Sequence, residues 1–117
     1  MKKLNCWLAG GLAALALVGA ATAAAPGEVV TPAQIEAATT AEQHEAIARS
    51  YDEEAVASER RAESHAKMAE TYRHVHKKTS GTSMANHCSR LEEGYRNAAS
   101  EYRKLAAEHR EMAAAAR

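Results

Sequence analysis

Small and apolar residues recur at seven-residue intervals through the last third of the chain. They form two rows, offset from each other by three or four positions: Met84, Leu91, Ala98, Leu105 and Met112, and Cys88, Tyr95, Tyr102 and His109. Two such rows are typical of a helix that contacts another helix along its whole length. No Pro and only one Gly interrupt the segment 83–115. The pattern therefore predicts a long helix over 83–115 that has a packing partner.

The preceding segment supplies this partner. Residues 40–76 contain no Pro or Gly and carry two rows of their own: Ala41, Ala48, Ala55, Ala62 and Ala69, and His44, Tyr51, Ser58, His65 and Tyr72. Between the segments, residues 77–82 (KKTSGT) combine the basic residues of a helix C-terminus with the Gly of a turn. So short a connection predicts an all-α fold, a long antiparallel two-helix hairpin with helices at 40–76 and 83–115.

Folding the chain about residue 80 predicts which side chains meet between the two helices. We expect three contacts along the shared face: Tyr72 with Cys88, His65 with Tyr95, and Tyr51 with His109. A polar side chain buried there needs a partner, so the alternating Tyr and His residues can also fix the register of the two helices.

Large apolar residues are scarce after residue 23. The remainder of the chain has two Leu, two Ile, four Val and no Phe or Trp, and Ala takes their place. A single hairpin of this composition buries little apolar surface. We therefore expect two copies to form a homodimer, a four-helix bundle with coiled-coil packing.

Residues 1–23 have the organisation of a secretory signal peptide. Lys2 and Lys3 precede an uncharged apolar stretch, 7–18, and a small-x-small site ends at Ala23. We expect cleavage near Ala23 and a periplasmic or secreted protein with no membrane span after cleavage. The alternative is an uncleaved segment that anchors the N-terminus in the membrane.

The leader that follows, residues 24–39, contains one helix-start pattern. Thr31-Pro32-Ala33-Gln34 has the spacing of a capping box with Pro at the first helical position. This pattern predicts a short helix before the hairpin.

Charge and motif content exclude several classes of function. The chain has 15 Lys and Arg and 15 Asp and Glu, and without Lys2 and Lys3 the acids exceed the bases by two. This balance argues against nucleic-acid binding. Ser58 and His65 are seven positions apart, about 10 Å along a helix, and no oxyanion donor accompanies them. We therefore expect no enzymatic activity.

The expected hairpin tip concentrates residues that bind soft metal ions. Cys88 and Met84 are four positions apart on one helix, and His76 approaches from the other. Thiolate, thioether and imidazole suit Cu(I) or Zn(II). His87 and, deeper in the hairpin, His65 complete the candidate ligands. No haem-attachment motif is present, so we hypothesise a copper or zinc site at the tip.

The alternative is an envelope structural or protein-interaction module, of the chaperone or adaptor kind, that binds no metal. In that case Cys88 is either a small buried residue or forms an intermolecular disulfide. The sequence leaves these alternatives open.

Overall fold

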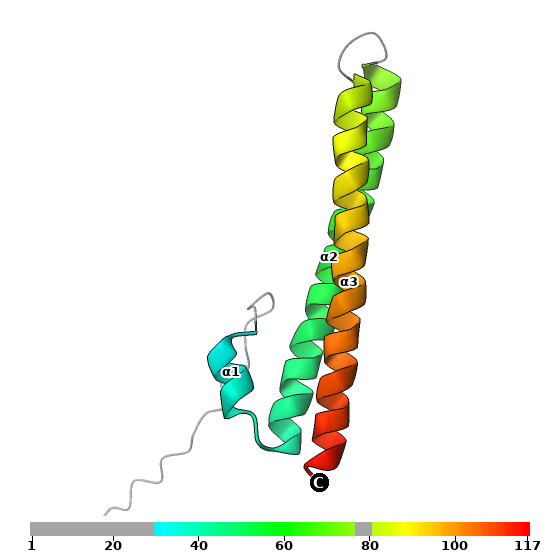
Figure 1. Ribbon diagram of the computed structural model, residues 1–117. Coiled ribbons are helices and arrows are strands. Elements are labelled where there is room, and N and C mark those ends of the chain that lie inside the picture. Colours follow the sequence, from blue (N-terminus) through cyan, green and yellow to red (C-terminus); the bar gives the residue numbers. More distant parts are fainter. Residues whose placement is uncertain (1–29, 77–80) are drawn as a thin grey trace, which may run out of the picture.

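The computed structural model describes residues 30–76 and 81–117, which form three helices and no strand. These are α1 (Pro32–Ala37), α2 (Ala41–Val75) and α3 (Gly81–Ala115). Helices α2 and α3 lie side by side and antiparallel along their full length, and α1 lies to the side of their open end (Figure 1). The all-α hairpin is confirmed. The expected signal peptide (1–23) and most of the turn lie outside the described residues.

Threonine side chains start both of the first two helices. Thr31 and Gln34 form a capping box at α1, with Pro32 at its first turn. Thr40 and Gln43 form another at α2, where the Gln43 side chain accepts hydrogen bonds from two consecutive backbone N–H groups. Each box satisfies donors that the first helical turn leaves free. The bounds of α2 are within one residue of the predicted 40–76.

Helix α3 begins at Gly81, two residues before the predicted start. Gly81 packs against the last turn of α2: a Cβ atom at this position would lie 2.5 Å from the carbonyl oxygen of His76 and 2.6 Å from that of Tyr72. Real Cβ atoms do not approach backbone oxygens so closely. A glycine is therefore needed where the two helices come together after the turn.

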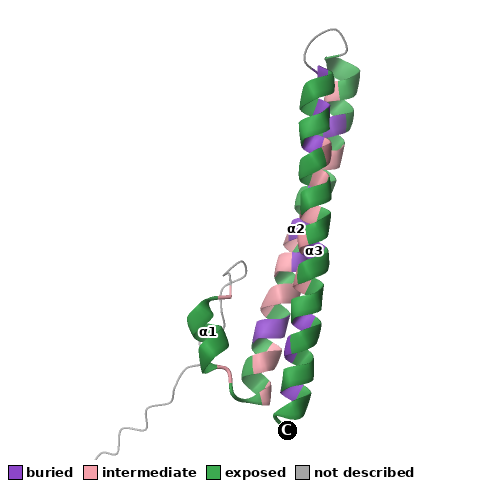
Figure 2. Cartoon of the chain, viewed as in Figure 1, coloured by how far each residue is buried: buried purple, intermediate pink, exposed green. Residues whose placement is uncertain are grey.

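The core of the hairpin is a thin seam of buried residues between α2 and α3 (Figure 2), most of which are alanines. The buried alanines follow a seven-residue register on both helices, with Glu92 at the one α3 position of the row that is not alanine: Ala48, Ala55, Ala62 and Ala69 on α2, and Ala85, Ala99, Ala106 and Ala113 on α3. Among the residues that the structure describes, the largest side chain that is fully buried is that of Ser58. Such small side chains let the helices approach closely, but each methyl group contributes only about 0.8 kcal/mol of burial.

One sequence prediction about α3 is wrong. The row that begins with Met84 does not face α2: Met84 is 41% exposed, Leu91 46% and Met112 48%. The neighbouring row, one position further along the chain, packs instead through its alanines. The physical reason is that Ala opposite Ala gives the closest helix contact, whereas a row of Leu and Met would hold the helices apart.

In the described part of the chain, no helix combines the length and the apolar character needed to cross a membrane.

Candidate functional site

Aromatic and imidazole rings stack across the seam beside the alanines. His65 and Tyr95 lie almost parallel with their ring centres 5.5 Å apart, and Tyr51 stacks on Tyr102 at 6.2 Å. Tyr51 also contacts His109 at 5.7 Å. The predicted pairs His65–Tyr95 and Tyr51–His109 are therefore confirmed, as ring contacts rather than hydrogen bonds. Most of these rings are only half-buried, because the single layer of alanines cannot cover them.

Two histidines meet at the open end of the hairpin. The Nδ1 atoms of His44 and His109 are 3.1 Å apart, the distance of a hydrogen bond in which a proton on one Nδ1 is donated to the other. Burial lowers the pKa of His109 from its ordinary value, the neighbouring His44 lowers it further, and Glu108 opposes both effects. This pair therefore favours neutral imidazole at His109.

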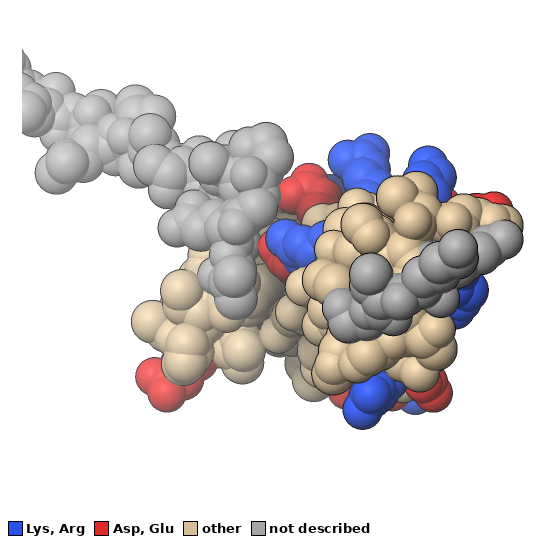
Figure 3. All heavy atoms as spheres, turned by 90° about the horizontal axis from the view of Figure 1, so that it is seen from above, with Lys and Arg blue, Asp and Glu red and all other residues tan. Residues whose placement is uncertain are grey.

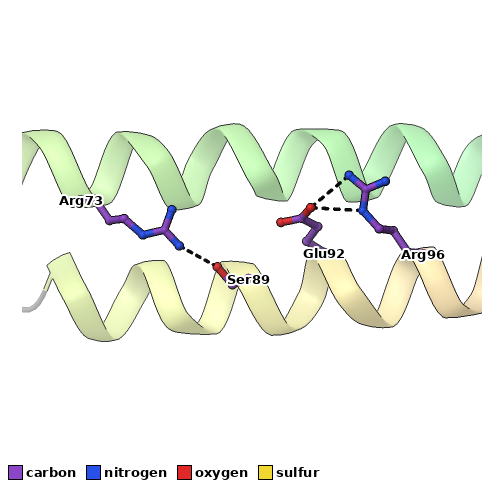
Figure 4. A network of polar contacts seen from close by, with 4 residues as sticks. All are labelled: Arg73, Ser89, Glu92 and Arg96. Carbon is purple, nitrogen blue, oxygen red and sulfur yellow. Dashed lines mark hydrogen bonds and ion pairs between the residues drawn. The ribbon is translucent and has the colours of Figure 1, made fainter.

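The hairpin has two sides on which both helices are exposed, and one of them carries ion pairs between the helices. We call it the ion-pair edge, and its pairs are Arg117–Glu45, Arg110–Asp52 and Arg103–Glu59. Near the tip, Arg73 of α2 donates a hydrogen bond of 2.9 Å to Ser89 of α3 on the same edge, while Arg96 turns back to Glu92 of its own helix (Figure 4). Viewed along the hairpin, acidic and basic side chains surround the two helices (Figure 3).

The opposite edge is apolar. We call it the apolar edge, and it combines one row from each helix: Met84, Leu91, Ala98, Leu105 and Met112 of α3, and Ile47, Met68 and Val75 of α2. The heptad register places these rows together, because each lies just before the alanine row of its helix and the helices are antiparallel. Ile47 is buried and Ala98 half-buried, and the other members are exposed.

Two charged residues, Glu54 and Arg61, interrupt the α2 row of the apolar edge. Glu54 makes no ion pair with any described residue, and the guanidinium of Arg61 lies 6.0 Å from the ring centre of Tyr95. The apolar edge is therefore a nearly uncharged strip with one acid and one base near its middle.

The hairpin tip shows where the predicted metal ligands lie. Cys88 is buried with Ala69 and Ala85, and Tyr72 packs against this cluster. Tyr72 was predicted to meet Cys88, and it packs against the cluster that contains Cys88. Because the thiol lies between the helices of one hairpin, a disulfide to a second copy would require the hairpin to open there.

The other predicted ligands differ in their surroundings. His76 caps α2 and contacts the ring of Tyr72 at 5.9 Å, whereas Met84 and His87 are exposed. His65 stacks on a tyrosine two helical turns deeper in the seam. Among residues 30–76 and 81–117, no three His, Cys, Asp or Glu side chains converge on a position that could hold a metal ion. The soft-metal hypothesis stays a prediction.

Sequence reasoning missed the contrast between the two edges, although the signal is present. Acids recur at seven-residue intervals in one helix and arginines at the same intervals in the other: Glu45, Asp52 and Glu59, and Arg103, Arg110 and Arg117. In an antiparallel pair such rows meet on one edge. Placing them there would have assigned the Met84 row to the opposite edge rather than to the seam.

Comparison of the chain with protein-family models, with curated proteins and with solved structures found no match.

Proposed function

We propose that this protein is a small exported, non-enzymatic helical module that acts by helix–helix association, and that its first partner is a second copy of itself. The observation that carries this proposal is the apolar edge. Its exposed Leu and Met side chains keep the seven-residue register of the seam, so they line one strip along the hairpin and are not scattered over the surface.

The size of the apolar edge supports a stable interface. Each long helix has 35 residues, so an edge about 50 Å long and two helices wide presents roughly 1,000 Å². Stable protein interfaces bury about 800 Å² on each partner. A second hairpin would also cover the half-buried rings of Tyr51, Tyr95 and Tyr102, which the register places on the side of the seam nearer the apolar edge.

The ion-pair edge is less suited to binding a second copy than the apolar edge. Its carboxylates and guanidiniums already pair within one hairpin, so an incoming partner would have to displace them or desolvate them. The apolar edge needs no such rearrangement. Two hairpins joined through it give a four-helix bundle, the smallest arrangement that adds a second apolar layer to the alanine seam.

Export is supported by residues 1–23 alone, which lie outside the described residues. Production of the full chain with its own N-terminus in a bacterial host tests this part. Mass spectrometry of the recovered protein is expected to show a chain that begins near Ala24. A chain that keeps residue 1 and stays with the membrane fraction would favour the anchored alternative.

The oligomeric state tests the association. The native mass of the recovered protein, measured by light scattering after size-exclusion chromatography, is expected to be twice the chain mass given by mass spectrometry. A native mass equal to one chain throughout the micromolar range would overturn the proposal.

The same preparation tests the soft-metal hypothesis. The reduced protein is titrated with Cu(I) or Zn(II) against a competing chelator, beside the variant Cys88→Ala. Binding tighter than micromolar that the substitution abolishes would establish a metal site at the tip. Binding that the substitution leaves unchanged would contradict a metal site at the tip.

A further inference from the structure

We infer that the two copies of this dimer pack with their apolar edges in contact and in antiparallel orientation. Glu54 of each copy then lies opposite the partner's Arg61. The inference rests on the proposed dimer and adds its geometry. Helix α2 then lies beside the partner's α2, helix α3 beside the partner's α3, and the two hairpin tips point in opposite directions.

The two charges on the apolar edge carry this inference. Glu54 is half-buried and makes no ion pair with a described residue. The guanidinium of Arg61 lies over the ring of Tyr95 and likewise makes no ion pair with a described residue. A dimer through this edge would cover both groups. A covered carboxylate or guanidinium without an opposite charge destabilises an interface, so the partner has to supply that charge.

The position of these charges fixes the symmetry. Glu54 and Arg61 are seven residues apart and flank the midpoint of α2, which runs from Ala41 to Val75. A two-fold axis through the apolar edge between them places each carboxylate opposite a guanidinium of the partner. Both charges are then neutralised by one operation, which is the self-complementarity that a two-fold interface requires.

The same axis matches the apolar residues. On α2 it places Ile47 opposite the partner's Met68. On α3 it passes between Ala98 and Leu105 and places these two residues opposite each other. Leu91 then faces the partner's Met112. Each of these three pairs joins apolar side chains, and small Ala98 faces larger Leu105, as close packing requires.

A parallel dimer with both tips at the same end lacks this complementarity. In that arrangement α2 lies beside the partner's α3, so Glu54 faces the partner's Leu105 and Arg61 faces the partner's Ala98. Both charges would be covered by apolar side chains. The antiparallel register is therefore the one that the sequence of the apolar edge favours.

Distances between spin labels on the two copies test the register. In a Cys88→Ala background, single cysteines replace Asn86 or Asn97, which are both exposed on α3 and lie outside the apolar edge. Antiparallel packing separates the two labels at position 86 by about 45 Å along the bundle and those at position 97 by about 15 Å. Pulsed dipolar spectroscopy is expected to show a much longer distance for Asn86→Cys than for Asn97→Cys.

The outcomes separate the register from the dimer itself. Short and similar distances at both positions would contradict the antiparallel register and leave the dimer standing. No intermolecular dipolar signal at either position, with a native mass of one chain, would contradict the dimer and the inference together.

A charge exchange provides a second test that needs no labels. Glu54→Arg places two guanidiniums opposite each other twice per dimer, and we expect it to weaken dimerisation about tenfold. Adding Arg61→Glu restores opposite charges, so the double variant is expected to recover most of the affinity. Glu53→Arg, at the adjacent exposed position, is the matched control. A double variant no tighter than Glu54→Arg would contradict the register.

Discussion

The two edges of the hairpin flank the same alanine seam and differ in whether their side chains find partners within one chain. On the ion-pair edge, two arginines of α3 and Arg117 just after it meet three acids of α2, so these charges are paired within one chain. On the apolar edge, Leu and Met side chains of the same register remain exposed. Both edges arise from rows spaced by seven residues, which antiparallel packing brings together.

This difference shows how a chain with little apolar content distributes its small and its large apolar side chains. Alanine at the contact allows close approach but buries little surface, so the larger side chains stay outside the seam. The ion-pair edge favours the observed register of α2 on α3, because a shift by one turn would separate every pair. The apolar edge retains most of the surface that can still be buried, and that surface is available to a partner.

The largest expected effect comes from placing a charge on the apolar edge. Leu91→Glu puts a carboxylate in the interface without a counter-charge, and we expect it to weaken dimerisation roughly hundredfold or more. Sedimentation equilibrium measures the change. Val56→Glu is the control, because Val56 is equally exposed at 44% but belongs to neither edge. Equal dissociation constants for the two variants would remove the distinction between the edge and the rest of the surface.

A smaller effect is expected from widening the seam. Ala106 is fully buried between the helices and Ala107 beside it is exposed. Ala106→Leu forces the helices apart and should lower the free energy of unfolding by about 1–3 kcal/mol, whereas Ala107→Leu should change it by less than about 0.5 kcal/mol. Urea denaturation at matched protein concentration compares them. Equal stabilities would mean that the alanine rows do not set the helix spacing.

Low pH should destabilise the open end of the seam, where His109 lies. The lowered pKa of His109 means that the unfolded chain binds protons more readily, so stability falls as the pH drops below about 6.5, the unfolded value. We expect the melting temperature to fall more between neutral pH and pH 5 in the wild type than in His109→Gln. His87→Gln, at an exposed site, should behave like the wild type. Parallel pH profiles for all three proteins would contradict this role of the His44–His109 pair.

The smallest effect is expected on the ion-pair edge. Arg103→Gln removes one pair whose side chains are both partly exposed, so stability should fall by less than about 1 kcal/mol, and less at high salt. The dissociation constant of the dimer should not change. Arg60→Gln, which removes an exposed arginine that pairs with no described residue, is the control. A marked loss of dimerisation in Arg103→Gln would show that this edge, too, contacts the partner.

The hairpin and the contact face of α2 were predictable from the sequence. Two segments free of Pro and Gly and joined by a short turn leave few alternatives, and the Ala69 and Tyr72 rows have no competing register. The capped start of α2 at Thr40 also follows from local chemistry, because a hydroxyl and an amide three residues apart satisfy the first N–H groups.

The contact face of α3 was not predictable by hydrophobicity alone. The Met84 row is more apolar than the alanine row beside it, yet the smaller residues take the contact because close approach favours them. The tip was also predicted only in part. Seven-residue spacing places Cys88 in the seam, but it does not show that Met84 turns outward while His76 caps α2.

The three methionines of the described residues provide the most direct test that a second copy covers the apolar edge. In the antiparallel dimer Met68 and Met112 are covered, whereas Met84 lies near the tip, beyond the end of the partner. Peroxide converts exposed methionine to the sulfoxide, and peptide mass spectrometry gives the rate at each site. We predict that Met68 and Met112 react about tenfold more slowly in the dimer than in Leu91→Glu, in line with the protection of buried side chains, while Met84 reacts equally in both. Equal rates at all three methionines in both proteins would contradict the covered edge.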